Sequence, residues 1–243
     1  MNPVLNIAGY RFTALEDLPA LRAALDAAAR RLSLTGTIIL APEGINLMLA
    51  GAPGEVERMI EAVRRCTGVA ELPLRRSWSA QPPFKRMRIR TKAEIVALKR
   101  PDLRPDRAAA PRIDAPQLNQ WLDEGRDILL LDTRNRFEVE MGTFRGAHHL
   151  NLRSFSDLPA AAAAAELQHE QRTIVTFCTG GIRCEKAALL MMELGAPRVV
   201  QLDGGILGWF SACGSRHFEG DCFVFDERSG VDAALAPIAP AGA

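Results

Sequence analysis

The sequence lacks several features that would assign it to a large class of proteins. No apolar run approaches the ~18 residues of a membrane-spanning helix, and the N-terminus MNPVLNIAGYRF has no charged segment followed by an apolar one. Five cysteines, an odd and scattered set, do not make a disulfide framework, and no Cys-x-x-Cys pair suggests a zinc site. We therefore expect a cytoplasmic protein with free thiols, no membrane contact and no metal.

The chain also lacks a net charge that would suggest a partner, since its formal charge is only +1. The charge is nevertheless unevenly distributed. Residues 75–107 hold eleven Lys and Arg against three Asp and Glu, a surplus of eight. Such a band predicts a polyanionic partner, although a solvated arginine-rich strand and linker would look the same. The candidate RNA-binding residues are Arg75, Arg76, Lys85, Arg86, Arg88, Arg90 and Lys92.

Residues 1–98 show the pattern of a small α+β domain. Apolar residues at helical spacing predict helices over 18–32 and 54–66. Runs rich in β-branched and alternating residues predict strands at 4–12, 34–40, 47–51, 71–78 and 86–91. This β-α-β-β-α-β order predicts a ferredoxin-like sheet. Trp78 and Phe84 could stack on bases or belong to the core.

A linker at 99–112, with three prolines, separates this domain from an α/β pattern over 113–222. Short apolar runs ending at Asp132, Phe177 and Leu202 predict buried parallel strands. Helices over 115–124, 159–168 and 185–194 alternate with them, so we expect a doubly wound parallel sheet. Residues 223–243 are expected to form a C-terminal tail.

The stretch TIVTFCTGGIRCEK (173–186) places Cys178 where a buried strand ends. Ligands of open α/β sheets bind beyond the carboxyl ends of the strands. Residues 179–182, Thr179, Gly180, Gly181 and Ile182, can turn their backbone N–H groups toward the sulfur. Arg183 and the positive end of the following helix add positive potential. We therefore predict a thiolate with a pKa below the ~8.5 of free cysteine.

The loop from Cys178 to Arg183 is one residue shorter than the Cys-x5-Arg cradle of cysteine phosphatases, which suits a single sulfur atom. The second half of the chain resembles the rhodanese family. The resemblance is closest to its tRNA uridine hydroxylase group, and the segments that carry it are CTGGIRCEK, DTRNRFEVEMGTFRGA, QLDGGI, CFVFDER, APEGIN and PFKRMRIRTKAEIV.

This resemblance implies oxygen-dependent hydroxylation of the wobble uridine of tRNA to 5-hydroxyuridine, with dioxygen as co-substrate and no other evident cofactor. It also implies tRNA rather than DNA as partner, and Cys178 as the active-site, persulfide-type cysteine. Longer members carry a cysteine-rich extension after CFVFDER. This sequence has VDAALAPIAPAGA there, so we expect the contribution of that extension to be absent or replaced.

Other residues near the loop could assist. Cys184 could resolve an oxidised Cys178, and Cys222 could approach the site, although both could simply be packed. Asp132 and Arg134 are expected to form a structural ion pair or loop anchor, with Glu138 as a partner for Arg134.

Two mechanisms and three functions remain open at this point. Cys178 could add to C6 of uridine, which makes C5 electron-rich, or it could act as a persulfide. A general sulfurtransferase would need the same loop but not the basic band. A non-catalytic binding module usually goes with loss of the cysteine, which is present here.

Overall fold

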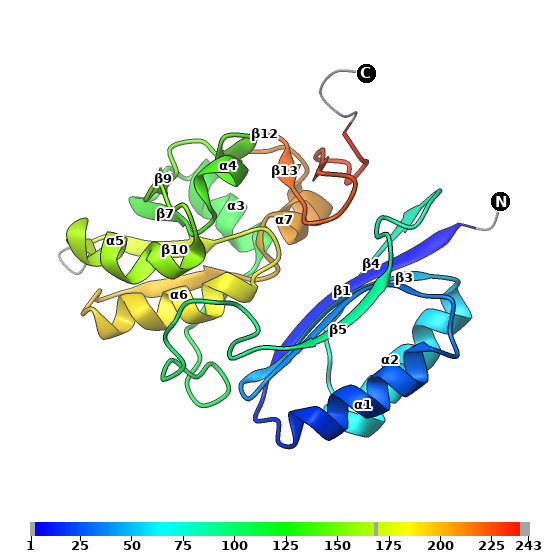
Figure 1. Cartoon of the computed structure of the whole chain (residues 1–243). Coiled ribbons are helices and arrows are strands. Elements are labelled where there is room, and N and C mark those ends of the chain that lie inside the picture. The colour runs from blue at the N-terminus through cyan, green and yellow to red at the C-terminus, as the bar shows by residue number, and fades with distance from the viewer. Residues whose placement is uncertain (1–2, 168–169, 239–243) are drawn as a thin grey trace. The chain divides into compact units, whose positions relative to one another are not determined.

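The computed structural model of the chain describes residues 3–167 and 170–238 and divides it into two compact units, Met1–Ala97 and Leu98–Ala243 (Figure 1). The last residue of the predicted helix 159–168 and the last five residues of the predicted tail lie outside the described residues. No helix in the described part of the chain is long and apolar enough to span a membrane.

The first unit is an α+β sandwich built on one five-stranded sheet. Its elements are β1 (Val4–Phe12), α1 (Leu18–Ala29), β2 (Thr35–Ala41), β3 (Gly44–Gly51), α2 (Pro53–Thr67), β4 (Leu74–Ser79) and β5 (Met87–Thr91). The strand order is β4-β1-β3-β2-β5, in which β5 alone pairs in parallel, with β2. The predicted ferredoxin-like order is confirmed, and β5 extends the sheet by one edge strand.

Both helices of the first unit cover the same face of this sheet (Figure 1). Leu25 of α1 and Met59 and Val63 of α2 pack against Ile38, Leu47 and other inward side chains of the strands. Side chains alternate between the two faces of a strand, so the residues between these core positions lie on a face that neither α1 nor α2 covers. On that face the side chains of the central strands are half-buried or buried, whereas Arg88 and Arg90 of β5 are exposed.

The second unit is built on a five-stranded sheet in which every pair of neighbours is parallel, in the order β6-β11-β10-β7-β9. The strands of this sheet and the helices of the unit are β6 (Arg112–Ile113), α3 (Ala115–Asp123), β7 (Ile128–Asp132), α4 (Arg136–Val139), β9 (His148–His149), α5 (Leu158–Ala164), β10 (Thr173–Phe177), α6 (Ile182–Glu193), β11 (Val199–Leu202) and α7 (Gly205–Cys213). Short elements complete it: β8 (Gly142–Phe144), a 3-10 turn (Phe155–Asp157), β12 (Phe218–Gly220), β13 (Cys222–Phe223) and β14 (Gly230–Val231).

Helices cover both faces of this second sheet, as the alternating pattern predicted. Val175 and Phe177 of β10 point into a core that they share with Leu118 of α3 and Trp209 of α7. Helices α5 and α6 lie together on the other face (Figure 1). Since neither face is open, ligands can approach this sheet only at its ends.

Segments set apart in the sequence as linker and tail contribute to the second unit. In the range 99–112, Leu103 and Ala110 are buried, and Arg112 pairs with Gln201 at the edge of the sheet. After residue 222, Val224 and Val231 belong to the core that contains Trp209. The apolar side chains in these segments explain why they pack, even though their prolines and small residues suggested otherwise.

Candidate active site and nucleic-acid interface

Cys178 lies immediately after β10, at the carboxyl end of a central strand of the parallel sheet. The chain then turns through Thr179 and Gly180 into α6, whose first residue is Ile182. Gly181 precedes the helix with φ 98°, a left-handed backbone conformation that glycine adopts without strain. The turn brings the Gly181 N–H to 3.1 Å from Sγ of Cys178, to which it donates a hydrogen bond.

The Cys178 sulfur is fully buried, with 0% of the residue exposed. Burial by itself would raise the pKa of this thiol. The hydrogen bond from Cys184, the charge of Arg183 and the backbone N–H groups of Arg183 and Gly181 outweigh burial and lower the pKa of Cys178. The loop therefore stabilises a thiolate by the kinds of interaction that the sequence suggested.

Arg183 is held in place by a buried carboxylate. Its Nη1 and Nη2 donate to the two carboxylate oxygens of Glu138 at 2.6 and 2.7 Å, and only 6% of the arginine is exposed. Such a bidentate pair fixes the plane of the guanidinium. Glu138, at the third position of a capping box at α4, forms its ion pair with Arg183 and not with Arg134, the expected partner, on which it acts only through its charge.

Asp132 and Arg134 form the expected ion pair at the end of β7. The Arg134 Nη2 donates to Asp132 Oδ2 at 2.7 Å and to the Gly142 carbonyl at 2.6 Å, and both side chains are 0% exposed. Thr143 donates its hydroxyl to the same aspartate oxygen at 2.8 Å. This network ties the β7 loop to β8, and Asp132 and Arg134 therefore anchor the loops beside the cysteine.

The start of α7 supports the Cys178 loop from the other side. The N–H groups of Ile206 and Leu207 donate to the carbonyls of Cys178 and Thr179 at 2.9 and 3.1 Å. Gly205 lies so close that a Cβ there would stand 2.3 Å from the Cys178 carbonyl oxygen. Only glycine fits at this contact, and its φ of +60° is a backbone conformation that residues with a side chain rarely adopt. The motif QLDGGI thus holds the loop in shape.

Two further cysteines lie beside the loop, and the other two do not. Cys184, on the first turn of α6, has its pKa raised by burial and by its hydrogen bond to Cys178, so it acts as the thiol donor of that pair. Burial raises the pKa of Cys222 to about 12, partly offset by Arg134 and by a hydrogen bond with Thr179. Cys66 lies on α2 of the first unit and Cys213 at the far end of α7. All five are free thiols.

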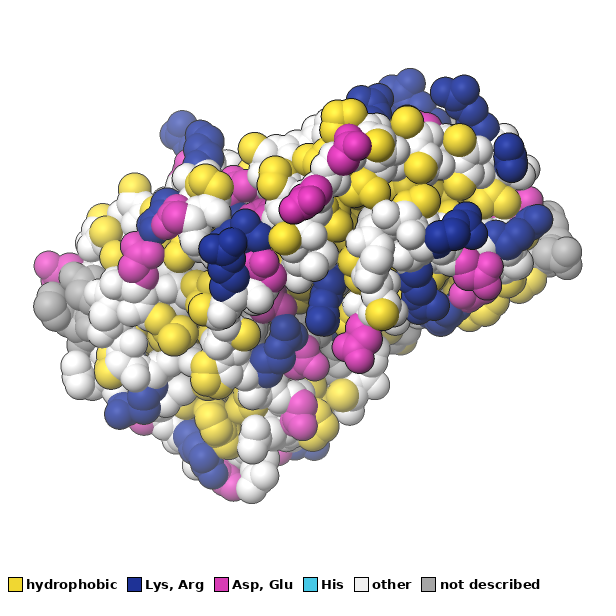
Figure 2. All heavy atoms as spheres, turned by 90° about the horizontal axis from the view of Figure 1, so that it is seen from below, with side chains coloured by type: hydrophobic (Ala, Val, Ile, Leu, Met, Phe, Trp, Pro, Cys, Tyr) yellow, Lys and Arg dark blue, Asp and Glu magenta, His cyan; other side chains and the backbone are white. Residues whose placement is uncertain are grey.

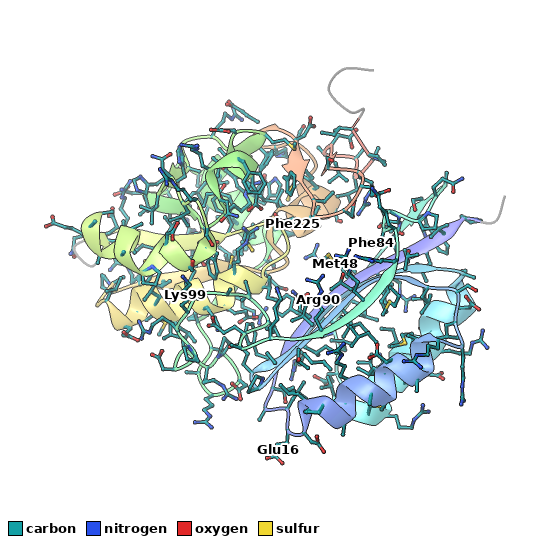
Figure 3. The ribbon with its side chains drawn as sticks, in the orientation of Figure 1. Glu16, Met48, Phe84, Arg90, Lys99 and Phe225 are labelled. Atoms are coloured by element: carbon teal, nitrogen blue, oxygen red, sulfur yellow. The ribbon has the colours of Figure 1, made fainter. Side chains whose placement is uncertain are left out.

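The strand register of the first sheet shows on which of its two faces each candidate RNA-binding residue lies. One row of directly opposed residues crosses all five strands on the face without helices, in the order Arg75, Ala8, Met48, Thr37 and Arg88. The next row contains Tyr10, Asn46, Ile39 and Arg90. An arginine therefore stands on each edge strand of the first row. Figure 3 shows Met48 and Arg90 extending from the sheet on the side away from α1 and α2.

Arg76 lies apart from this set. It is opposite the core residue Ile7, so it belongs to the helix-covered face, and its Nη1 is 2.5 Å from Glu57 of α2. Arg88, in contrast, has its pKa lowered first by the charge of Arg86, with smaller contributions from burial and Arg90. Like charges thus crowd at β5, which is the arrangement expected where a polyanion binds.

The remaining predicted residues lie outside these rows. Lys85 and Arg86 are exposed in the connection from β4 to β5, and Lys92 is exposed just after β5. Trp78 is 57% exposed on the edge strand β4, and Phe84 is half-buried. On the face of the molecule drawn in Figure 2, Lys and Arg side chains are interspersed with Asp, Glu and hydrophobic ones.

Sequence reasoning missed three features of the site. The first is the buried turn at Glu138, which the capping-box spacing of Asn135 and Glu138 could have revealed. The second is the close backbone approach at Gly205, which the glycine pair in QLDGGI could have revealed. The aromatic residues Phe137, Phe223 and Phe225 gave no periodic signal and meet only in the fold. Within the described ranges, no group of three or more His, Cys, Asp and Glu side chains could hold a metal ion.

Comparisons with known proteins agree with this architecture. Residues 4–95 match the family described as UPF0176 acylphosphatase like domain, and residues 114–212 match the rhodanese-like domain. A Variovorax paradoxus protein named tRNA uridine(34) hydroxylase is 49% identical over 98% of this chain and 90% of that protein. The Bordetella avium protein of the same name is 45% identical over 97% of this chain and 99% of its own length. The chain therefore belongs to the tRNA uridine(34) hydroxylase family.

Proposed function

We propose that this protein hydroxylates the wobble uridine of tRNA at C5, giving 5-hydroxyuridine, with dioxygen as co-substrate and Cys178 as the reacting group. The names of its relatives over nearly the whole chain support the reaction. The observation that carries the assignment to Cys178 is its lowered pKa at the carboxyl end of β10. Because its proposed substrate is tRNA, we also propose that the enzyme works in the cytoplasm.

The first unit serves in this proposal as the tRNA-binding domain. Arg75, Arg88 and Arg90 stand at the edges of the helix-free face, and no acidic partner of Arg88 or Arg90 occurs among residues 3–167 and 170–238. The charge of Arg88 and Arg90 is therefore available for phosphate groups. Arg76, already paired with Glu57, contributes less.

The reaction fixes what the site must supply. Replacing the hydrogen at C5 by a hydroxyl takes one oxygen atom from dioxygen, and the other leaves as water after two electrons and two protons are added. We propose that these two electrons and two protons come from a pair of sulfur groups, either two thiols that join as a disulfide or a persulfide and a thiol that join as a trisulfide. Cys184 keeps its proton and donates a hydrogen bond to Cys178, while Glu138 holds the Arg183 guanidinium beside the sulfur.

Two roles for Cys178 fit this chemistry, an adduct at C6 and a persulfide. The complete burial of its sulfur favours the persulfide. The outer sulfur of a persulfide lies one S–S bond, about 2 Å, beyond Sγ, whereas Sγ itself meets a base only after the loop opens. Trapping with tRNA that contains 5-fluorouridine separates the two. A stable Cys178 adduct in mass spectrometry would establish addition at C6, and recovery of unmodified tRNA with Cys178 carrying an extra sulfur would support the persulfide.

The function is tested by nucleoside analysis of tRNA from a deletion strain. We expect wild-type protein to restore 5-hydroxyuridine and Cys178→Ser to leave it absent. Cys66→Ser, on α2 of the first unit, is the matched control and should behave as wild type. If Cys178→Ser restored 5-hydroxyuridine, Cys178 would not be the catalytic group. If the wild-type protein did not restore it, the proposed reaction would be refuted.

A further inference from the structure

Three phenylalanine rings form a cluster on the surface of the second unit. Phe137 is on α4, Phe223 ends β13, and Phe225 follows two residues later. The Phe223 ring lies 5.0 Å from each of the other two, and Phe137 and Phe225 are 6.5 Å apart, all edge to face. Phe137 is 45% exposed and Phe225 54%. Figure 3 labels Phe225 on the segment that follows β13.

This cluster continues directly into the cysteine site. The guanidinium carbon of Arg183 lies 5.9 Å from the centre of the Phe225 ring. Phe137 precedes Glu138, the residue that holds Arg183 through two hydrogen bonds. Cys222, next to Phe223, has a hydrogen bond with Thr179 of the loop. The rings therefore border the loop that carries Cys178.

Phe137 and Phe225 are large apolar side chains exposed side by side, and contiguous exposed apolar surface of this kind marks interaction sites. In edge-to-face packing the edge of one ring meets the face of its neighbour, and the exposed parts of Phe137 and Phe225 leave ring surface for a flat partner. A phosphate is a poor fit here, since the charge of Arg183 is already matched by Glu138. A flat, uncharged, polar-edged ring such as a pyrimidine base fits, because bases of single-stranded RNA stack on aromatic side chains.

We propose that Phe137, Phe223 and Phe225 form the stacking surface that receives the unpaired pyrimidine base presented to Cys178. The proposal rests on the proposed function, since the occupant is the base to be modified. Phe225 also covers the Arg183 guanidinium, so a base stacked there lies next to the group that stabilises the reactive sulfur. The cluster thereby positions the base without taking part in the chemistry.

Photocross-linking tests this assignment without requiring turnover. An anticodon stem-loop RNA with 5-iodouridine at the wobble position is irradiated with the full-length protein, and cross-linked peptides are identified by mass spectrometry. We expect the cross-link at Phe137, Phe223 or Phe225, and none when the iodouridine is placed in the stem. Cross-links confined to the first unit, or to residues distant from the loop, would overturn the proposal.

Kinetics give a second readout. Phe225→Leu should raise the KM for the stem-loop about 5- to 150-fold, the range expected for one lost base stack, with a smaller change in kcat. Phe225→Tyr keeps the ring and should retain most of the affinity. Met192→Ala removes another exposed apolar side chain, on α6, and should change neither constant.

These experiments separate the inference from the proposed function. Active wild type with an unchanged KM in Phe225→Leu would refute the stacking surface while leaving the hydroxylase assignment intact. Inactive wild type that still cross-links at the cluster would refute the reaction and keep the base-binding surface. Thermal unfolding of each variant shows whether a lost activity reflects a lost fold.

Discussion

The two sheets of this protein offer their surroundings different surfaces. The antiparallel-rich sheet of the first unit has helices on one face only, so whole rows of side chains remain on the other, with arginines on both edge strands. The parallel sheet of the second unit is covered on both faces, and its buried Asp132–Arg134 pair and the Cys178 loop lie at the ends of β7 and β10. An open face suits an extended polyanion, whereas a strand end suits one reacting atom.

The largest effect is expected where the second unit buries its charges. Glu138→Ala removes the carboxylate that pairs with Arg183 and leaves that buried guanidinium without its bidentate partner. We expect the free energy of unfolding to fall by about 3–5 kcal/mol, measured by urea denaturation. Glu140→Ala, which breaks the exposed pair with Arg136, should change it by less than about 0.5 kcal/mol. Equal losses in the two variants would show that burial of the pair does not matter.

The next effect concerns the contact between α7 and the Cys178 loop. Gly205→Ala places a methyl group against the Cys178 carbonyl, and we expect a loss of about 1–3 kcal/mol in stability together with loss of hydroxylation. Gly54→Ala, at a site with open space in the first unit, should be close to neutral. Full activity of the Gly205 variant would mean that the loop tolerates displacement.

The charge state of Cys178 gives a third test. Because its pKa lies below the ~8.5 of free cysteine, the thiolate should be present at neutral pH and disappear only as the pH falls through a lower midpoint. The measurement is the ultraviolet thiolate absorbance of wild type minus that of Cys178→Ser. Cys222, with its pKa raised to about 12, should contribute nothing near neutral pH. A midpoint at or above ~8.5 would contradict the stabilised thiolate.

The smallest effect is expected on the open face of the first unit. Arg90→Ala should weaken stem-loop binding and reduce the slope of log K against log salt by about 1, the value for one lost phosphate contact. Arg76→Ala removes a cation of the same kind from the helix-covered face and should leave the slope unchanged. Equal slopes for both variants would mean that RNA does not use this face.

The sequence predicted most elements of both sheets, because their apolar residues recur with periods of helices and strands. Prediction from the sequence was least accurate for segments whose apolar residues show no periodicity. The ranges 99–112 and 223–243 contain proline and small residues that suggest open chain, yet Leu103, Val224 and Val231 bury their side chains in the second unit. Isolated apolar residues of this kind give no pattern, and only the presence of a core to receive them decides their position.

The sequence by itself determined the order of the elements, the thiol at the end of a strand and the basic band, since these depend on local spacing and composition. The tertiary structure alone decided which charges meet when they lie far apart in the chain. It paired Glu138 with Arg183, turned Arg76 toward Glu57, and brought Phe137 to Phe223 and Phe225. Those contacts join residues far apart in the chain, and their partners are selected by the packing of whole elements, which local sequence does not encode.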